Sequence, residues 1–259
     1  MKRWTVLLFA AVLFLFACSR PEPRSNSKTG SSSPEQPIYF HVDPSTAGTI
    51  AGRMTFRGRK PVIKKVDMDE DPQCEALHKR PVYDESEVVN RNGTLANVFV
   101  YIKSGLEGKT FAPPSTPVTI DQKGCWFIPR VLGIEVGQTL RVTNSDPVTH
   151  NIHPRPHDNR EWNHSQSSGD PPILRKFTQP EVMIRVKCNI HGWMHAWIGV
   201  VGNPYYAVTG SDGSFELKNV PPGSYTLGAW QEVLGSQQKT VTVPPSGKVR
   251  VDFDFKGES

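Results

Sequence analysis

Long hydrophobic runs, helical periodicity and a large excess of one charge are all missing from this chain of 259 residues. No long stretch repeats its apolar residues at the helical period, which argues against a helical bundle. The 30 lysines and arginines nearly balance the 25 acidic residues and form no basic cluster, so we expect no nucleic-acid partner. The Gly-x-Ser-x-Gly, Walker and His-Glu-x-x-His patterns are also absent, and with them the sequence signatures of the corresponding enzyme classes.

The start of the chain predicts export. Lys2 and Arg3 precede an apolar run at 6–17, which is too short to span a bilayer but typical of a signal-peptide core. The run ends in Leu-Phe-Ala-Cys18, which resembles the lipobox of bacterial lipoproteins, although its Phe is bulkier than the residue usual there. The resemblance implies a signal peptide at 1–17, lipidation of Cys18 and a membrane anchor through that lipid. Ser19 fits sorting to the outer membrane, facing the periplasm or the cell surface, while an ordinary signal peptide or a single anchor helix is the alternative.

The remaining chain is predicted to be all-β, because short β-rich runs alternate with Gly- and Pro-containing turns. Its C-terminal part resembles the carboxypeptidase-regulatory-like, transthyretin-like β-sandwich modules. Their Thr-Asp-x-x-Gly-x-Phe and Pro-Pro-Gly-x-Tyr patterns occur at 209–215 and 221–225, with Gly210 in place of the Asp. Such modules open with a Gly-x-Ile-x-Gly strand and a Val-x-Val strand, which occur here at 48–52 and 96–102.

These positions predict an interrupted domain. We expect one β-sandwich formed by 46–112 together with 203–255, and a separate domain at 113–202 inserted between its two parts. Insertion is tolerated at surface loops, where the ends of a compact domain lie close together. Residues 18–45 are rich in Ser, Pro, Gly and Arg and are expected to form a disordered tether.

The predicted inserted domain concentrates the residues with metal-binding chemistry. Residues 127–129 and 134–144 are predicted to form strand, turn and strand, with Gly137 in the turn, and they lead into the loop that carries the first histidines. Apolar residues alternate along a further strand that ends at Cys188. The segment Cys188-Asn-Ile-His191-Gly-Trp-Met194 follows directly. Six of the eight histidines fall in this domain: His150, His153, His157, His164, His191 and His195.

Two motifs in this domain resemble cupredoxins of the plastocyanin and amicyanin type. The first is Asn-x-Asp-x-x-x-His150-Asn151, and the second is Cys-x-x-His-x-x-Met. The resemblance covers 117–201 and implies a Greek-key β-sandwich with one copper ion. Its implied ligands are His150, Cys188, His191 and, as the axial ligand, Met194. Two imidazoles and a thiolate with a weak thioether suit both copper oxidation states, and Asn151 is expected to hydrogen-bond the ligand loop.

Other interpretations of single residues stay open. His195 offers a harder donor than Met194 and is the alternative fourth ligand, and His153 is a further candidate. His157 and His164 lie in a Pro-, Asp- and Ser-rich loop and are expected to be solvated. Taken singly, a buried cysteine at a strand end is an ordinary small apolar residue. The copper interpretation therefore depends on the joint spacing.

The number of cysteines also bears on the predicted copper site. If Cys18 is lipidated, Cys74, Cys125 and Cys188 remain, and an odd number in an oxidising compartment leaves one thiol over. A Cys74–Cys125 disulfide would free Cys188 for a metal, whereas a Cys125–Cys188 disulfide is the rival pairing.

The resemblance predicts an electron carrier rather than an enzyme. Electrons would leave through His191 at the surface, with Trp193 beside it, towards a redox partner such as a dehydrogenase or a cytochrome. Two alternatives remain: a copper storage, delivery or sensing lipoprotein, or a β-sandwich docking module that holds no metal.

Overall fold

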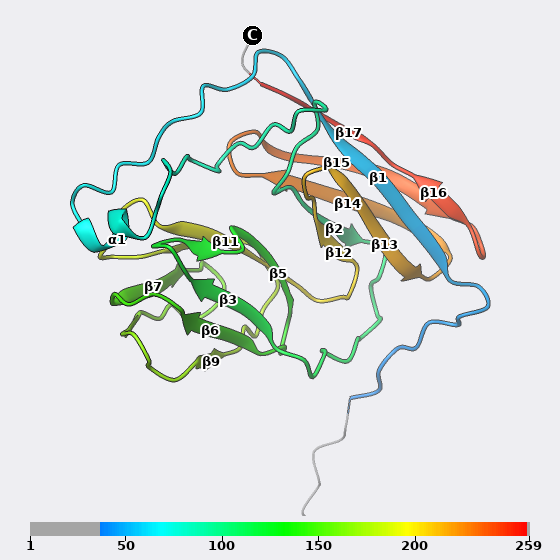
Figure 1. Ribbon diagram of the computed structural model, residues 1–259. Helices are drawn as coiled ribbons and strands as arrows, with labels where there is room; N and C mark the ends of the chain where they lie inside the picture. Colours follow the sequence, from blue (N-terminus) through cyan, green and yellow to red (C-terminus); the bar gives the residue numbers. More distant parts are fainter. Residues whose placement is uncertain (1–36, 258–259) are drawn as a thin grey trace, which may run out of the picture. The chain divides into compact units, whose positions relative to one another are not determined.

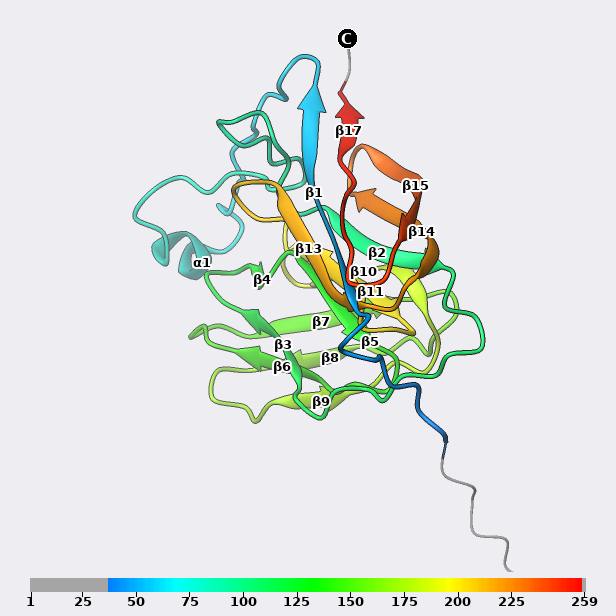
Figure 2. The ribbon, with the colours of Figure 1, turned by 90° about the vertical axis from the view of Figure 1, so that its right-hand side faces the viewer.

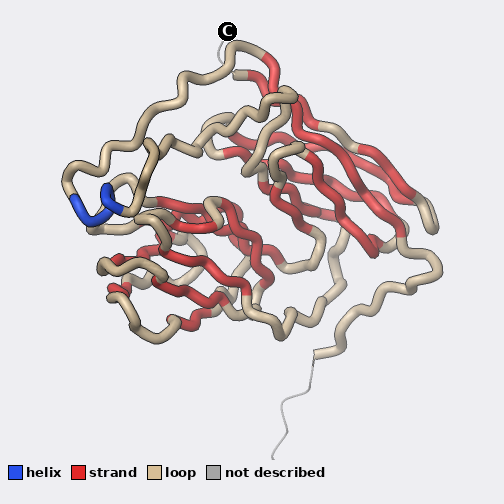
Figure 3. The backbone as a smooth tube through the Cα atoms, viewed as in Figure 1, coloured by secondary structure: helices blue, strands red, loops and turns tan. Residues whose placement is uncertain are grey.

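The computed structural model describes residues 37–257 as strands, connecting loops and one short helix, which confirms the all-β prediction (Figure 3). The predicted signal peptide, the lipidated Cys18 and the first part of the tether lie outside these residues. Among the described residues, no helix has the length and apolar character needed to cross a membrane.

Two of the four sheets use strands from both ends of the described chain, and together they form what we call the first sandwich (Figure 1). One sheet has the order β13 (Ser214–Val220), β1 (Gly48–Arg57) and β16 (Lys248–Arg250), with β17 (Phe253–Lys256) also paired to β1. The other has the order β12 (Tyr206–Val208), β2 (Phe99–Ser104), β14 (Gly223–Gln231) and β15 (Gly235–Val243).

The other two sheets use only the middle of the chain and form the second sandwich. One has the order β5 (Val131–Glu135), β11 (His195–Val201), β10 (Glu181–Lys187), β7 (His150–Arg155) and β8 (His164–Gln166). The other has the order β4 (Phe127–Ile128), β3 (Val118–Gln122), β6 (Leu140–Asn144) and β9 (Ile173–Arg175). β3 pairs with β6 in parallel and β5 with β11 in parallel, while the remaining pairs in these sheets are antiparallel.

Each sandwich has its own apolar core. In the first, alternate residues of β1, β2, β13 and β14 meet between the sheets, with Phe253 and Phe255 of β17 fully buried among them. In the second, Ile184 and Val186 of β10 face Ile120 and Val142 of the opposite sheet. Burial of these side chains contributes the main stabilisation of each sandwich. The division of the chain into domains stays a prediction.

A third cluster joins the two sandwiches. Phe99 of β2 contacts Val131 and Val201 of the second sandwich, and the Trp197 and Trp230 rings lie 5.0 Å apart. Trp197 therefore packs where the two sandwiches meet.

The connection between β1 and β2 contains the only helix of the described residues, α1 (Pro72–Ala76). We call residues 64–84 the cap segment. Its two ends pair with each other, because Val66 donates its N–H to Val82 O at 2.9 Å and Asp84 donates to Lys64 O at 2.9 Å. Figures 1 and 2 both place α1 at the edge of the second sandwich, so a segment that leaves the first sandwich reaches the other one.

Candidate metal centre

The candidate ligands lie on neighbouring strands. His150 is the first residue of β7, and Cys188 directly follows β10, which pairs with β7 in antiparallel fashion. His191 lies in the turn between β10 and β11. Cys188 donates its N–H to Met194 O at 3.0 Å and Met194 donates to His191 O at 3.0 Å, so the backbone closes this turn without any metal.

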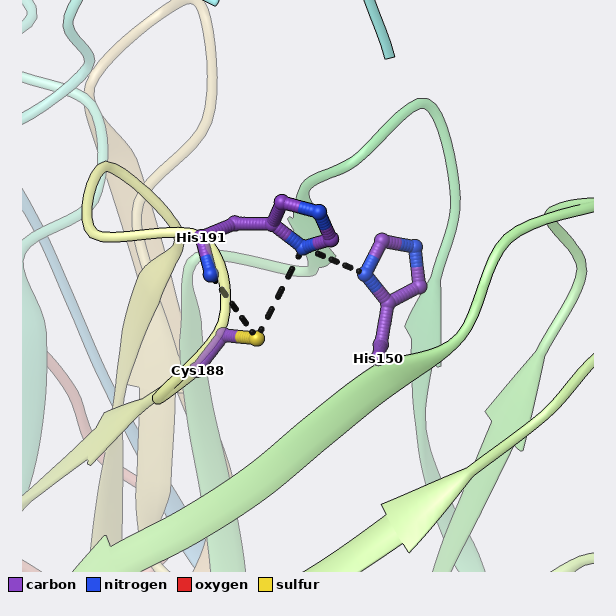
Figure 4. A group of neighbouring side chains, drawn as sticks. All are labelled: His150, Cys188 and His191. Carbon is purple, nitrogen blue, oxygen red and sulfur yellow. Dashed lines mark hydrogen bonds between the residues drawn. The ribbon is translucent and has the colours of Figure 1, made fainter. Parts of the chain in front are cut away.

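Three side chains converge at this point from β7 and from the turn after β10 (Figure 4). The Nδ1 atoms of His150 and His191 lie 3.0 Å apart, and Cys188 Sγ lies 3.7 Å from His191 Nδ1. One atom from each of the three residues lies within 4.8 Å of the others. All three side chains are buried, with exposed fractions of 0%, 3% and 2% for His150, Cys188 and His191. Water therefore competes little for these atoms.

A carboxylate holds the outer nitrogen of each imidazole. His150 Nε2 lies 2.8 Å from Asp146 Oδ2, and His191 Nε2 lies 3.0 Å from Asp71 Oδ2. The hydrogen bond from His191 lowers the pKa of Asp71. Burial alone would raise the pKa of Asp146, but the hydrogen bonds from His150 and from backbone N–H groups outweigh burial and lower it. Both carboxylates are therefore ionised acceptors, and both Nε2 atoms donate.

This arrangement fits a bound cation. If each Nε2 carries the ring proton, each Nδ1 presents a lone pair, and two lone pairs 3.0 Å apart repel one another. A shared proton or a metal ion between the rings removes the repulsion. Burial alone would lower the pKa of His150, whereas its contacts with Asp146 and Cys188 outweigh burial and raise it. The residues present thus fit copper, because a metal ion would take the place between the two nitrogen lone pairs.

The surroundings of the Cys188 sulfur favour the thiolate over the thiol. It accepts the backbone N–H groups of Asn151 and His191, both at 3.4 Å. Burial alone would raise the pKa of this thiol, but the neighbouring His150 and these N–H groups lower it from 9.0 to about 7. A thiolate available near neutral pH is the form that binds a soft metal.

Met194 and Asn151, the other residues predicted at the metal site, are both buried. Met194 is fully buried in the core that contains Cys188. Asn151 Oδ1 accepts the N–H of Asn189 at 3.1 Å, and its amide donates to Asn163. Asn151 therefore links β7 to the residue that follows Cys188.

The other histidines have partners elsewhere. Nε2 of His195 accepts from Arg130 Nη2 at 2.5 Å, and its Nδ1 donates to Trp193 O at 3.0 Å. His153 contacts Glu161 at 2.5 Å and Asn189 at 3.2 Å. His157 and His164 are exposed, as expected. The structure therefore groups none of these four with Cys188.

Cys74 and Cys125 form a disulfide, and Cys188 is the free cysteine of the described residues. This is the pairing that leaves Cys188 available for a metal. Both bonded cysteines are fully buried, and Cys74 Sγ lies 3.6 Å from His191 Nε2. The disulfide thus ties the cap segment to the edge of the second sandwich that carries the candidate ligands.

His191 differs from the sequence expectation in its exposure. The expected electron route places this ring at the surface, but the cap segment covers it with Asp71 and Cys74. Trp193, the other expected route residue, is half-buried and donates Nε1–H to Cys125 O at 3.1 Å, with its ring 5.2 Å from that of His191. The sequence expectation missed this cover because the covering residues belong to the connection between β1 and β2, more than a hundred residues earlier in the chain.

Comparisons with known proteins give partial likenesses. The family model described as polysaccharide lyase family 4, domain II, matches residues 192–251. No curated protein matches the chain. A copper-containing nitrite reductase from Thermus scotoductus is 23% identical over 39% of this chain, with a TM-score of 0.32, and the match spans 26% of that enzyme.

Two small copper proteins are also similar over part of the chain. A purple cupredoxin from Nitrosopumilus maritimus is 23% identical over 32% of this chain and 99% of its own, with a TM-score of 0.28. A mutant amicyanin in the Cu(I) form is 18% identical over 39% of this chain and 98% of its own, with a TM-score of 0.29.

Sequence reasoning missed two residues of the centre. Asp146 lies four residues before His150, inside the motif that identified this histidine, so its position was a usable signal. Asp71 ends the acidic run at 67–71, which reads from sequence as a solvated turn. Asp67, Asp69 and Glu70 are indeed exposed, but the Asp71 carboxylate contacts His191. No local pattern distinguishes Asp71 from its acidic neighbours.

Proposed function

We propose that this chain is an exported copper protein that transfers electrons through one mononuclear site. The observation that supports this most directly is the buried group of His150, Cys188 and His191, with both Nδ1 atoms turned towards the thiol by carboxylates. Cys188 supplies the soft ligand, the two histidines supply neutral nitrogen donors, and Met194 is the proposed weak fourth ligand. Bound copper would supply one-electron redox chemistry at this place.

The protein residues limit rearrangement between oxidation states. The turn from 188 to 194 is closed by two backbone hydrogen bonds, and two N–H groups already point at Cys188 Sγ. These N–H groups stabilise the negative charge on sulfur. A site that is fixed by its own backbone needs little reorganisation when the charge of the metal changes.

The electron route includes His191 and Trp193. Because the cap segment covers His191, a redox partner would contact the cap segment or Trp193 rather than the imidazole itself. The partner class follows the sequence prediction, a dehydrogenase or a cytochrome. The first sandwich would then serve as a docking module.

Copper storage or delivery is the second candidate, and the burial of His191 favours it. A covered ligand slows contact with a redox protein and also slows metal loss. Fast electron self-exchange of the copper-loaded protein would support electron transfer, whereas slow exchange with transfer of copper to an acceptor protein would support delivery.

The proposed location is a lipid anchor at Cys18 in the outer membrane. Support comes from the basic start, the short apolar run and the Leu-Phe-Ala-Cys18 sequence. Mass spectrometry of the mature protein from membranes should find a lipidated N-terminal peptide that starts at Cys18. A peptide that starts elsewhere, or one without lipid, would remove this part of the proposal.

An absorption spectrum tests the copper site. We expect the full chain, loaded with Cu(II), to develop an intense visible thiolate-to-copper band that Cys188→Ala abolishes. His153→Ala is the matched control, because this histidine lies on β7 but outside the ligand group. A colourless wild-type protein that binds no copper would refute the proposal and leave the metal-free docking module as the better description.

A further inference from the structure

The cap segment brings a charged side chain to the metal centre from outside the second sandwich. It is fixed by the Cys74–Cys125 disulfide and by His78 Nε2, which lies 2.7 Å from Gly124 O. Both contacts reach the turn that precedes β4. The cap segment is therefore held at two points beside the site.

The two carboxylate oxygens of Asp71 have different hydrogen-bond partners. Oδ1 accepts the N–H groups of Gln73 and Cys74, at 2.9 and 3.3 Å, and so caps the N-terminus of α1. Oδ2 lies 3.0 Å from His191 Nε2. Because α1 holds one oxygen and the disulfide holds α1, the other oxygen has a fixed direction towards the imidazole.

We propose that Asp71 is a positioning residue for the copper site, which it serves by orienting His191 and by stabilising the higher charge of Cu(II). This inference rests on the proposed function. The hydrogen bond keeps the ring proton on Nε2 and therefore leaves the Nδ1 lone pair facing Cys188. The negatively charged carboxylate at the outer nitrogen also makes the imidazole a stronger donor, which favours Cu(II) over Cu(I).

Asp146 has the same relation to His150 but is a poorer probe. It also accepts the N–H groups of Gly124 and Cys125, and its side chain is 4% exposed. Asp71 has a side chain that is 29% exposed, so its replacement disturbs the fold less. The two carboxylates together explain why both Nδ1 atoms point at one place.

The test compares three variants of the full chain. Asp71→Asn keeps the shape but removes the charge. Asp71→Ser keeps a side-chain oxygen that can cap α1 but is too short to reach His191. Asp69→Asn is the matched control, because Asp69 is an exposed carboxylate two residues away in the same segment.

Copper affinity and reduction potential are the first measurements. We expect both Asp71 variants to bind Cu(II) about 10–100-fold more weakly, the usual effect of removing a hydrogen-bond partner of a ligand. If the affinity for Cu(II) falls tenfold more than the affinity for Cu(I), the reduction potential rises by about 59 mV. Asp69→Asn should change affinity by less than about twofold, since an exposed charge contributes little.

A nuclear magnetic resonance spectrum of the Cu(I) form gives an independent signal. The Nε2–H proton of His191 should be visible and protected from exchange in the wild type, and lost in Asp71→Ser. Wild-type affinity and potential in both Asp71 variants, with the thiolate–copper band present, would overturn the proposal. A wild-type potential in Asp71→Ser alone would also overturn it, because that variant has lost the hydrogen bond to His191. If the wild type itself lacks the band, the proposed function fails instead.

Discussion

Replacing Asp146 by alanine should lower the free energy of unfolding of the copper-free protein by about 4 kcal/mol. Its carboxylate is buried and accepts three donors: Gly124 N at 2.6 Å, Cys125 N at 2.7 Å and His150 Nε2 at 2.8 Å. It thereby links the loop before β7 to the turn that carries the disulfide. Removing it breaks this link and leaves buried donors without an acceptor.

The magnitude follows from these contacts. A hydrogen bond to a charged group contributes about 1.5–3 kcal/mol, and an unsatisfied buried donor costs about 1–3 kcal/mol. The three contributions are not additive, because water can enter the space left by the carboxylate. Breaking a buried ion pair costs about 3–5 kcal/mol, which sets the scale, and about 2–4 °C per kcal/mol gives a fall in Tm of about 8–16 °C.

The amide variant refines the prediction. In Asp146→Asn the amide oxygen can take the place of Oδ2 and accept from Cys125 and His150, while its NH₂ group faces the N–H of Gly124. One donor therefore loses its acceptor, and we expect a loss of about 2 kcal/mol.

Urea unfolding at pH 7, followed by tryptophan fluorescence, measures both changes. Asp170→Ala is the control, because this exposed carboxylate accepts only the N–H of Ser167 at 2.7 Å; its cost should stay below about 1 kcal/mol. The pKa of Asp146 is lowered in the folded protein, so its contribution is complete above the ordinary aspartate pKa and is lost as the pH falls through the folded value. The difference between wild type and variants should therefore shrink in acid. A loss below about 1 kcal/mol in Asp146→Ala would refute the reasoning, since a buried carboxylate with three donors should cost several times that.

Three further predictions use the same measurements. Replacing Cys74 and Cys125 together by alanine removes a cross-link between residues 51 apart and should lower the unfolding free energy by about 4 kcal/mol. An unchanged unfolding free energy would contradict this prediction, because the cross-link would then not restrict the unfolded chain. Arg130→Met removes the guanidinium that lies 2.9 Å from the largely buried Glu232 carboxylate and leaves His195 Nε2, at 3.1 Å, as its remaining contact; we expect a loss of about 3 kcal/mol, at least half recovered when Glu232→Leu is added, and simple addition of the two losses would show that the pair is not coupled. In the copper-free protein, the ultraviolet absorbance of the Cys188 thiolate should rise with pH, with a midpoint at pH about 7. Because the pKa of this thiol is lowered from 9.0 on folding, the protein should also gain stability as the pH rises from 7 to 9. A midpoint of the absorbance near pH 9 would contradict both expectations.

Much of the second sandwich could be predicted from local pattern. The alternation of Ile184 and Val186 in β10 and of Cys188 directly after it places all three on the buried face, and the structure buries them. The turn from Cys188 to Met194 is short, so its ligand candidates are necessarily close. His150 needed a further step, because only the pairing of β7 with β10 brings it to the same point.

The sequence alone could not predict that the cap segment covers His191. Nothing in the acidic run at 67–71 indicates that its last residue contacts a histidine 120 positions later. The contact depends on the path of the cap segment from the first sandwich to the second and on the disulfide that fixes it. His195 shows the same limit, since its partner Arg130 became a neighbour only when β11 packed beside β5.

The sequence by itself determined the all-β class, the alternation of the strands and the closeness of Cys188, His191 and Met194 within one short turn. These properties follow from side-chain period and from spacing within a few residues, which backbone geometry converts directly into position. Only the tertiary structure decided that both imidazoles are held by carboxylates and that the cap segment covers His191. Such contacts join residues far apart in the chain, and their partners are selected by packing and charge in the folded protein rather than by any local pattern.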